Sequence, residues 1–324
     1  QEILDVQSET ELRAPVDRRD EAVYPAAEDG GEGRFGESMA EPDVPGVMGA
    51  GRDVGTVDTL SFNHDSGSCC YHSPAYDCHG PSDNPMSRDP ILSLPWPDAR
   101  PLPDTFFDRD ALLVARELLG KVIRHRQGNL WLAARIIETE AYYLEEKGSH
   151  ASLGYTEKRK ALFLDGGHIY MYYARGGDSL NFSAGGPGNA VLIKSGHPWL
   201  DRISDHTALE RMQSLNPDSQ GRPREIGRLC AGQTLLCKAM GLKVPEWDAQ
   251  RFDPQRLFVD DVGERPSQVI QAARLGIPKG RDEHLPYRFV DATFAAFCTR
   301  NPLRRGQVAG RDYHLLGHQD PHLQ

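Results

Sequence analysis

Residues 104–300 alternate apolar runs with turn residues, whereas residues 1–103 show no sustained apolar period. Gly, Pro, Asp, Glu and Ser are frequent in the first hundred residues, and such a composition buries too little apolar surface to fold alone. The prolines between residues 85 and 103 predict a stiff, extended linker. We therefore expect a disordered acidic and Pro-rich region over 1–103, one folded domain over 104–300 and a C-terminal tail over 301–324.

Strand and helix patterns alternate within the folded part. Turn residues at 127–129 separate the first two strands, and Gly120 and Gly241 are placed to end helices. Sequential hairpins with helices between and after them predict an α+β domain with a curved, mainly antiparallel sheet flanked by helices. The expected strands span 122–126, 130–142, 169–173, 190–194, 257–260 and 287–290, and the expected helices span 110–119, 199–215, 233–240 and 267–275.

The charge of the chain divides at about residue 100. The whole chain has a formal net charge of −10, with 37 Lys and Arg against 47 Asp and Glu. Residues 1–100 hold 7 of the basic and 20 of the acidic residues, so residues 101–324 hold 30 and 27. The folded part therefore has a slight positive excess, which is compatible with a nucleic-acid partner.

Several classes of protein are disfavoured. Six cysteines are too few for a disulfide scaffold of this size, and no apolar stretch reaches the length of about 18–20 residues that spans a membrane. No basic segment followed by an apolar one begins the chain, so we expect an intracellular protein of the cytoplasm or nucleoid, or of the nucleus in a eukaryote. The grouped residues Cys69, Cys70, His72, Cys78 and His79 match no familiar zinc spacing, and we expect neither metal nor cofactor.

The stretch RIIETEAYY, residues 135–143, places two carboxylates at the end of an apolar strand. The strand period of two puts Glu138, Glu140 and Tyr142 on one face. One interpretation is a strand end stabilised by ion pairs with a nearby arginine. The other is a pocket in which a carboxylate activates a water molecule beside a flat ligand. The stretch alone favours the first interpretation.

Two further segments could contribute to such a pocket. In GGHIYMYY, residues 166–173, Tyr170 and Tyr172 share a strand face and could stack on bases or pack in a core. The triplet Lys158-Arg159-Lys160 could neutralise phosphates or remain solvated surface. Lys194, which ends an apolar strand, could extend to water or hold an anion or a water beside Glu140.

Read in order, the motifs resemble those of the alkyladenine (3-methyladenine) DNA glycosylase family, the type without a helix-hairpin-helix. The resemblance covers about residues 104–290. It rests on FFDRDALLVARELLGKVI, RIIETEAYY, GSHAS, GGHIYMYY, AVLIKSG, LCAGQTLLCKAMGL, ARLGI and LPYRF.

The resemblance implies a role for each matching position. Glu140 corresponds to the general base that activates the attacking water, and Lys194 to a cationic residue that helps to hold it. Tyr142 and Tyr172 correspond to the two walls that enclose a flipped base. His150 corresponds to a residue lining that pocket, and Asn181 to the residue that excludes normal guanine by crowding its exocyclic amine.

The sequence departs from the vertebrate pattern at two places. Vertebrate relatives have arginine where this chain has Lys194, and lysine keeps the charge without the bidentate fork. They also insert a hairpin-tip tyrosine into the duplex, where this chain has Arg175 in a segment about one residue shorter. Arg175 is therefore the expected plug, and Lys158, Arg159 and Lys160 are the other expected DNA contacts.

These residues predict a monofunctional, purine-specific DNA repair glycosylase that acts as a monomer on duplex DNA containing damaged purines, with no membrane partner. It would flip out alkylated or deaminated purines and leave an abasic site. Two alternatives remain open at this point. One is a hydrolase of another N- or O-glycoside that uses Glu140 with Glu138 or Asp165. The other is a non-catalytic DNA-binding protein on the same fold.

Overall fold

The structure is a computed structural model that describes residues 94–174 and 176–317. All of these residues fall within one compact unit of the chain. Of the region predicted to be disordered over 1–103, residues 1–93 lie outside the described residues, as do its cysteine and histidine group and the predicted plug Arg175. Residues 94–103 are described and pack on the domain, where Trp96 contacts Trp131 and the Leu102 N–H donates to the Val259 carbonyl, so the prediction was wrong for this part. In the part that is described, no helix has both the length and the apolar character needed to cross a membrane.

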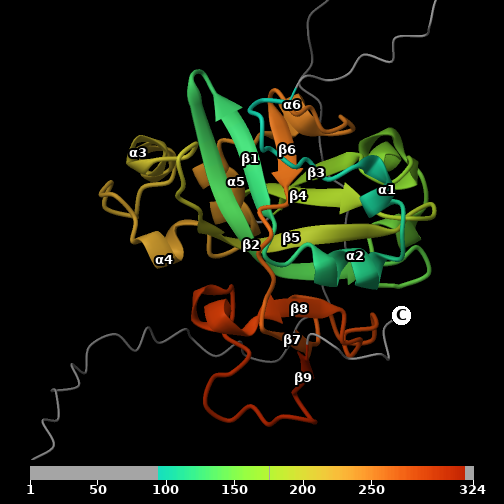
Figure 1. Cartoon of the computed structure of the whole chain (residues 1–324). Coiled ribbons are helices and arrows are strands. Elements are labelled where there is room, and N and C mark those ends of the chain that lie inside the picture. Colours follow the sequence, from blue (N-terminus) through green and yellow to red (C-terminus); the bar gives the residue numbers. More distant parts are fainter. Residues whose placement is uncertain (1–93, 175, 318–324) are drawn as a thin grey trace, which may run out of the picture. The chain divides into compact units, whose positions relative to one another are not determined.

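The described residues form a sheet of nine strands in which every pairing of named strands is antiparallel. The main path runs β3-β4-β5-β2-β8-β7-β9, and β1 and β6 extend from β2 (Figure 1). With helices packed against this sheet, the predicted α+β class is confirmed. The strands are β1 (Val122–Gln127), β2 (Leu130–Tyr142), β3 (Ile169–Ala174), β4 (Gly177–Ser183), β5 (Ala190–Pro198), β6 (Leu257–Asp260), β7 (Gln268–Ala272), β8 (Arg288–Asp291) and β9 (Tyr313–Gly317).

Strand β2 is the centre of the sheet, because it pairs with β1, β5 and β8. The β1–β2 hairpin turns at Gly128, whose φ of 59° lies in the left-handed region that glycine adopts without strain. The β2–β5 register shifts on both sides of Glu138. Such irregularities re-aim side chains next to them, and here they lie beside the two strand carboxylates.

Helices and 3₁₀ helices cover the sheet. Helix α2 begins where the Asp110 carboxylate accepts hydrogen bonds from two backbone N–H groups, and α5 ends at Gly241 with a left-handed φ of 66°. The Thr139 hydroxyl donates to the Ala115 carbonyl and so ties β2 to α2. The helices are α1 (Asp104–Phe107), α2 (Ala111–Glu117), α3 (His206–Leu215), α4 (Ile226–Leu229), α5 (Gln233–Met240) and α6 (Val244–Trp247), and the 3₁₀ helices are η1 (Ala151–Leu153), η2 (Glu157–Phe163) and η3 (Ala292–Phe297).

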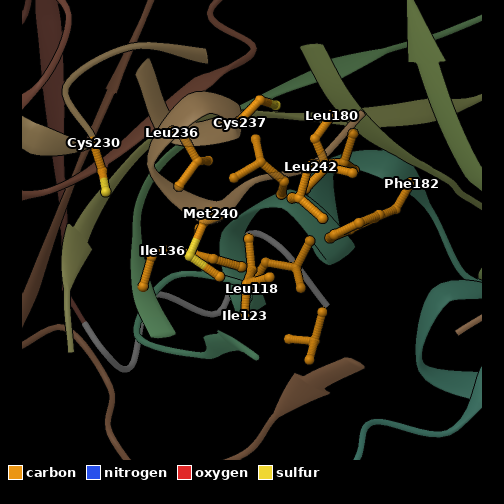
Figure 2. Close-up of a cluster of buried hydrophobic side chains, with 14 of the residues drawn as sticks. Leu118, Ile123, Ile136, Leu180, Phe182, Cys230, Leu236, Cys237, Met240 and Leu242 are labelled. Carbon is orange, nitrogen blue, oxygen red and sulfur yellow. The ribbon is translucent and has the colours of Figure 1, made fainter. Parts of the chain in front are cut away.

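The main hydrophobic core lies between the sheet and helices α2, α3 and α5 (Figure 2). It includes Cys230 and Cys237 as buried free thiols, and burial raises the pKa of both. These thiols therefore stay protonated and pack as small apolar groups. Labelled members of this core are Leu118, Ile123, Ile136, Leu180, Phe182, Leu236, Met240 and Leu242.

Two of the predicted elements were wrong in type or extent. The expected helix over 267–275 is instead strand β7, which pairs with β8 and β9. Its pattern was ambiguous, because Val269 and Ile270 are buried in clusters on opposite faces of the sheet. The expected helix over 199–215 begins only at His206, after Asp205 caps it. Strands β4 and β9 were not predicted, since a two-glycine turn and an exposed C-terminal edge obscure their periodicity.

Candidate active site

Strand pairing places residues that are distant in sequence in one row on one face of the sheet. Glu140 on β2 pairs with Leu192 on β5, Leu192 pairs with Asn181 on β4, and Asn181 pairs with Tyr170 on β3. Directly paired residues of antiparallel strands project from the same face. The strand carboxylate, the amide and the tyrosine are therefore neighbours on this face, which we call the site face.

The Glu140 carboxylate is fully buried and surrounded by donors. The Tyr142 hydroxyl donates to its Oε2 at 2.8 Å, and the Leu275 backbone N–H donates to its Oε1 at 3.1 Å. Lys194 Nζ lies 3.4 Å from Oε1 and supplies a positive charge. The carboxylate oxygens are thus held in a fixed orientation by one cation and two hydrogen bonds, which is how a preorganised base is supported.

The Tyr142 hydroxyl keeps its proton. Burial raises the pKa of Tyr142 well above its usual value, and the negative charge of Glu140 raises it further. A protonated phenol at neutral pH can only donate toward the carboxylate at this contact. Its hydrogen bond therefore fixes the tyrosine ring next to the acid.

A second aromatic group lies on strand β3. The rings of Tyr170 and Tyr172 are stacked with centroids 5.5 Å apart, and His150 packs edge-on against Tyr172 at 4.5 Å. His150 Nδ1 is 3.0 Å from the Tyr170 hydroxyl. No ring contact between Tyr142 and Tyr172 occurs within residues 94–174 and 176–317, so the two tyrosines do not pack against each other.

His150 stands at the N-terminus of η1 with part of its surface exposed. The loss of water around its imidazole lowers its pKa, and the positive charges of Arg159 and Arg281 lower it further. The neutral imidazole is therefore favoured at neutral pH, with one nitrogen able to donate and the other able to accept.

Asn181 is held by its neighbour in the row. Its side chain is buried, and Nδ2 donates to the Tyr170 backbone carbonyl at 3.1 Å. This bond fixes the plane of the amide on the site face. The structure thus brings together all six residues expected at the chemical site: Glu140, Lys194, Tyr142, His150, Tyr172 and Asn181.

The other strand carboxylate has different partners. Glu138 is fully buried and accepts from Arg288 Nε at 2.7 Å, from the Ser195 hydroxyl and from the Thr299 backbone N–H at 3.1 Å. Arg288 also donates to the Arg300 carbonyl. The ion-pair interpretation of the sequence therefore describes Glu138, whereas Glu140 has the surroundings of a site residue.

Sequence reasoning did not identify Arg274, which is buried behind Tyr142. Its guanidinium lies 4.5 Å from the Tyr142 ring centroid and 5.4 Å from that of Tyr287. Nη1 donates to the Ala141 carbonyl at 2.9 Å, and the side chain forms an ion pair with Glu146. The segment was predicted to be a helix, so nothing in the sequence indicated that Arg274 lies beside Tyr142. Only its position in the ARLGI motif could have suggested a role.

Arg274 adjoins Leu275, the residue whose backbone N–H holds Glu140. We expect Arg274→Met to lower the single-turnover rate of the reaction at this site by about 10²-fold, because a displacement of about 1 Å at a reacting group costs that much. Arg274→Lys, which keeps the charge for Glu146 but not the stacked plane, should recover part of the rate. Arg222→Gln, at an exposed ion pair, is the matched control. An unaltered single-turnover rate in a folded Arg274→Met variant would exclude this positioning role.

The predicted phosphate-binding triplet lies in η2. Lys158 and Lys160 are exposed and Arg159 is half-buried. The Lys160 ammonium is 4.0 Å from Glu157, a distance at which an exposed pair contributes little. These cations therefore remain available to a charged partner.

A family model described as methylpurine-DNA glycosylase matches residues 105–294, more than half of the chain. The chain belongs to the methylpurine-DNA glycosylase family. The resemblance inferred from its motifs is thereby confirmed. The protein is a DNA repair glycosylase, a monofunctional enzyme that hydrolyses N-glycosyl bonds of DNA.

Individual relatives agree with the family. The chain is 99% identical over 239 residues to a Pseudomonas aeruginosa (strain UCBPP-PA14) protein provisionally named 3-methyladenine DNA glycosylase, which covers 74% of this chain and 100% of the relative. It is 77% identical over 215 residues to a Pseudomonas savastanoi protein with the same provisional name, covering 66% of this chain and 96% of the relative. It is 31% identical over 218 residues to the mouse DNA-3-methyladenine glycosylase, covering 63% of each.

Proposed function

We propose that this glycosylase acts as a monomer on duplex DNA containing alkylated or deaminated purines, flips the damaged nucleotide out and hydrolyses its N-glycosidic bond. The observation that carries the proposal is the buried Glu140 carboxylate, held by Tyr142, Lys194 and the Leu275 N–H on the same face as the β3 aromatic group. A buried carboxylate held by these donors can activate a water molecule for hydrolysis. A protein that only binds DNA would not need such a group.

Base binding is assigned to the tyrosines. A base inside the duplex cannot be reached, and extruding it costs a few kcal/mol, least for a damaged or mismatched base. Stacking on an aromatic ring returns about 1–3 kcal/mol per base. Tyr142 and Tyr172, which are not packed on each other, would together offset the extrusion cost. His150 and Asn181 would then contact the edge of the extruded base.

Discrimination against guanine is assigned to Asn181. Its amide is fixed by the bond to the Tyr170 carbonyl, so it cannot rotate away from an approaching group without losing that bond. Guanine carries an exocyclic amine at C2, where adenine and hypoxanthine carry only a hydrogen. A fixed amide beside this amine would crowd guanine and admit the other purines.

In the proposed reaction, Glu140 accepts a proton from a water molecule that attacks the anomeric carbon of the sugar. The bond to the base breaks through an oxocarbenium-like transition state, whose positive charge the carboxylate also stabilises. The electron pair of the broken bond leaves with the purine. A purine alkylated at N3 or N7 is already cationic and departs without an acid, while a neutral lesion such as hypoxanthine must gain a proton as it leaves.

The proposed role of Lys194 is to hold the carboxylate and the water, since its ammonium lies 3.4 Å from Glu140. Its ammonium is paired with the Glu140 carboxylate, so Lys194 is placed to support the base and not to act as a nucleophile that would form a Schiff base. This agrees with a monofunctional enzyme that leaves the DNA strand intact.

A two-carboxylate glycoside hydrolase, the first alternative, is disfavoured by the surroundings of the candidate partners. Glu138 is fully engaged by Arg288, Ser195 and Thr299, and Asp165 is an exposed residue paired with Arg251. Neither is free to act across a sugar from Glu140, as paired carboxylates do in such enzymes.

Matched duplexes test the proposal. Each carries one hypoxanthine, 3-methyladenine, 7-methylguanine or ethenoadenine, or the undamaged purine at the same position, and is incubated with excess protein. We expect free base to be released from at least one damaged duplex and not from its undamaged counterpart, with the strand intact until alkali cleaves the abasic site. Failure to release any damaged base, or equal release of normal guanine, would contradict the proposal.

A further inference from the structure

Residues 299–312, which follow Cys298 at the end of η3 and precede β9, lie beyond residues 105–294, which match the family. We call this segment the C-terminal arm. It contains turns closed by local hydrogen bonds, in which Val308 N–H donates to the Asp312 carboxylate at 2.9 Å and Gly310 N–H donates to the Tyr313 carbonyl at 2.8 Å. Strand β9 then attaches its end to β7. The arm therefore has a defined place at the edge of the sheet.

Strand register puts Tyr313, the residue that follows the arm, on the site face. Glu140 pairs with Arg288 on β8, Arg288 pairs with Ala272 on β7, and Ala272 pairs with Tyr313 on β9. Tyr313 therefore projects from the same face as Glu140. In agreement with this, Tyr313 packs with η3 residues on a small buried cluster that includes Ile270, which shares a face with Ala272.

The arm is also tied to the site by hydrogen bonds. The Thr299 N–H donates to Glu138, and the Arg300 carbonyl accepts from Arg288. Both bonds involve buried groups of strands β2 and β8. The beginning of the arm is thus held by the strand pair that carries Glu140, and its end by β9.

The arm is basic, and its arginine side chains are accessible to a charged partner. No Asp or Glu occurs from residue 292 to residue 311, a stretch that contains Arg300, Arg304, Arg305 and Arg311. All four arginines are exposed. Arg311 is paired with Asp312, whereas Arg304 and Arg305 form no ion pair with any residue in the described ranges. A pair of unpaired, exposed guanidinium groups fits backbone phosphates.

A second basic segment lies on the opposite side of Glu140. Segment η2, with Lys158, Arg159 and Lys160, packs against β3 and β4, whereas η3 packs against β7 and β8. Strand β2 lies between these two groups in the sheet order. A duplex centred on Glu140 would therefore have one flank beside η2 and the other beside the arm.

The dimensions agree with this arrangement. Strand β9 is three positions from β2, and strands are about 4.8 Å apart, so the edge lies roughly 14 Å from the Glu140 strand. The phosphates of one DNA strand recur about every 3.4 Å along the helix axis. The arm would thus meet phosphates about four base pairs from the extruded nucleotide.

We propose that the C-terminal arm binds backbone phosphates on the DNA flank opposite the one next to η2, through Arg304 and Arg305. The proposal rests on the DNA-glycosylase function and adds a contact surface outside the family-matched residues. It does not depend on which lesion the enzyme removes, because phosphate contacts carry no base information.

The test is the salt dependence of binding by the full chain to an undamaged 30-base-pair duplex. Each lost phosphate contact reduces the slope of log affinity against log salt by about 0.9, so Arg304→Gln/Arg305→Gln should reduce it by about 2. The charge-matched control is Arg211→Gln/Arg222→Gln, whose residues are exposed on and after α3, a helix packed on the opposite sheet face. This control should leave the slope unchanged.

The rate of excision on a damaged duplex distinguishes a failure of the arm proposal from a failure of the proposed glycosylase function. At saturating enzyme, the arm variant should excise at the rate of the unaltered protein, because Arg304 and Arg305 touch no residue of the site. A duplex that ends about three base pairs from the lesion on the flank next to the arm no longer reaches Arg304 and Arg305. On this duplex the arm variant and the unaltered protein should bind equally. An unchanged salt slope, an equal loss in the control, or a lost excision rate at saturation would overturn the role of the arm.

Discussion

Replacing Glu140 with glutamine is expected to lower the single-turnover rate of base excision by at least about 10²–10⁴-fold, the contribution typical of a general base. Glutamine has nearly the same shape and can still accept from the Leu275 N–H. It cannot take a proton from water, and it carries no charge to stabilise a positive sugar. The damaged duplex should bind this variant at least as tightly, because a negative charge has been removed. Excision and binding are measured on the same preparation.

A loss of binding together with excision would show that Glu140 shapes the pocket, and excision at the unaltered rate would exclude it as the base. Glu210→Gln, at an exposed position of α3, is the matched control for the loss of one carboxylate. It should leave both quantities unchanged. The comparison works because Glu140 is buried among donors, whereas Glu210 lies in solvent.

Replacing Glu138 with glutamine is expected to affect stability rather than chemistry. The variant leaves the buried Arg288 guanidinium without its ionic partner, and breaking a buried pair in this way costs about 3–5 kcal/mol. For a domain of this size each kcal/mol lowers the Tm by about 2–4 °C. Thermal unfolding followed by circular dichroism measures the change. A Tm equal to that of the unaltered protein would contradict the structural role of Glu138.

A milder variant tests the same network without leaving a charge unpaired. Ser195→Ala removes one hydrogen bond to the Glu138 carboxylate, and a bond to a charged group is worth about 1.5–3 kcal/mol. It should lower the Tm by less than Glu138→Gln and leave excision unchanged. An equal fall in Tm for Ser195→Ala and Glu138→Gln would contradict the large contribution assigned to the ion pair between Glu138 and Arg288.

Much of the site could be predicted because its chemistry lies in short, local patterns. The period of two in a strand places Glu138, Glu140 and Tyr142 on one face, and the regular pairing of residues 138–140 with β8 keeps the two glutamates there. Tyr170 and Tyr172 share a face for the same reason. These local features, read in order, were sufficient for the family resemblance and the α+β class.

The residues that contact Glu138, Glu140 and Tyr142 could not be predicted, because they are distant in sequence and reach the site only through strand pairing. Leu275 and Arg274 follow strand β7, which the sequence pattern suggested was a helix, and they reach Glu140 and Tyr142 only through the sheet. The division of roles between the two glutamates also depends on distant groups. Arg288 and Thr299 engage Glu138, and nothing within the strand distinguishes the two acids.

The arm was beyond sequence reasoning for a related reason. The tail expected over 301–324 includes β9, whose exposed side chains hide the strand period, and the domain boundaries themselves remain a prediction. A basic, turn-rich segment is usually solvated surface. Its two ends are held beside the site face by the hydrogen bonds of Thr299 and Arg300 and by the pairing of β9 with β7.

The most direct test of the account compares Glu140→Gln and Glu138→Gln in one single-turnover excision assay, on the same damaged duplex and below the Tm of both variants. The account predicts that the folded Glu138→Gln variant excises within about tenfold of the unaltered protein, while Glu140→Gln binds the duplex and releases almost no base. The reverse pattern, or equal loss in the two variants when both are folded, would contradict the assignment of Glu140 as the residue that activates water.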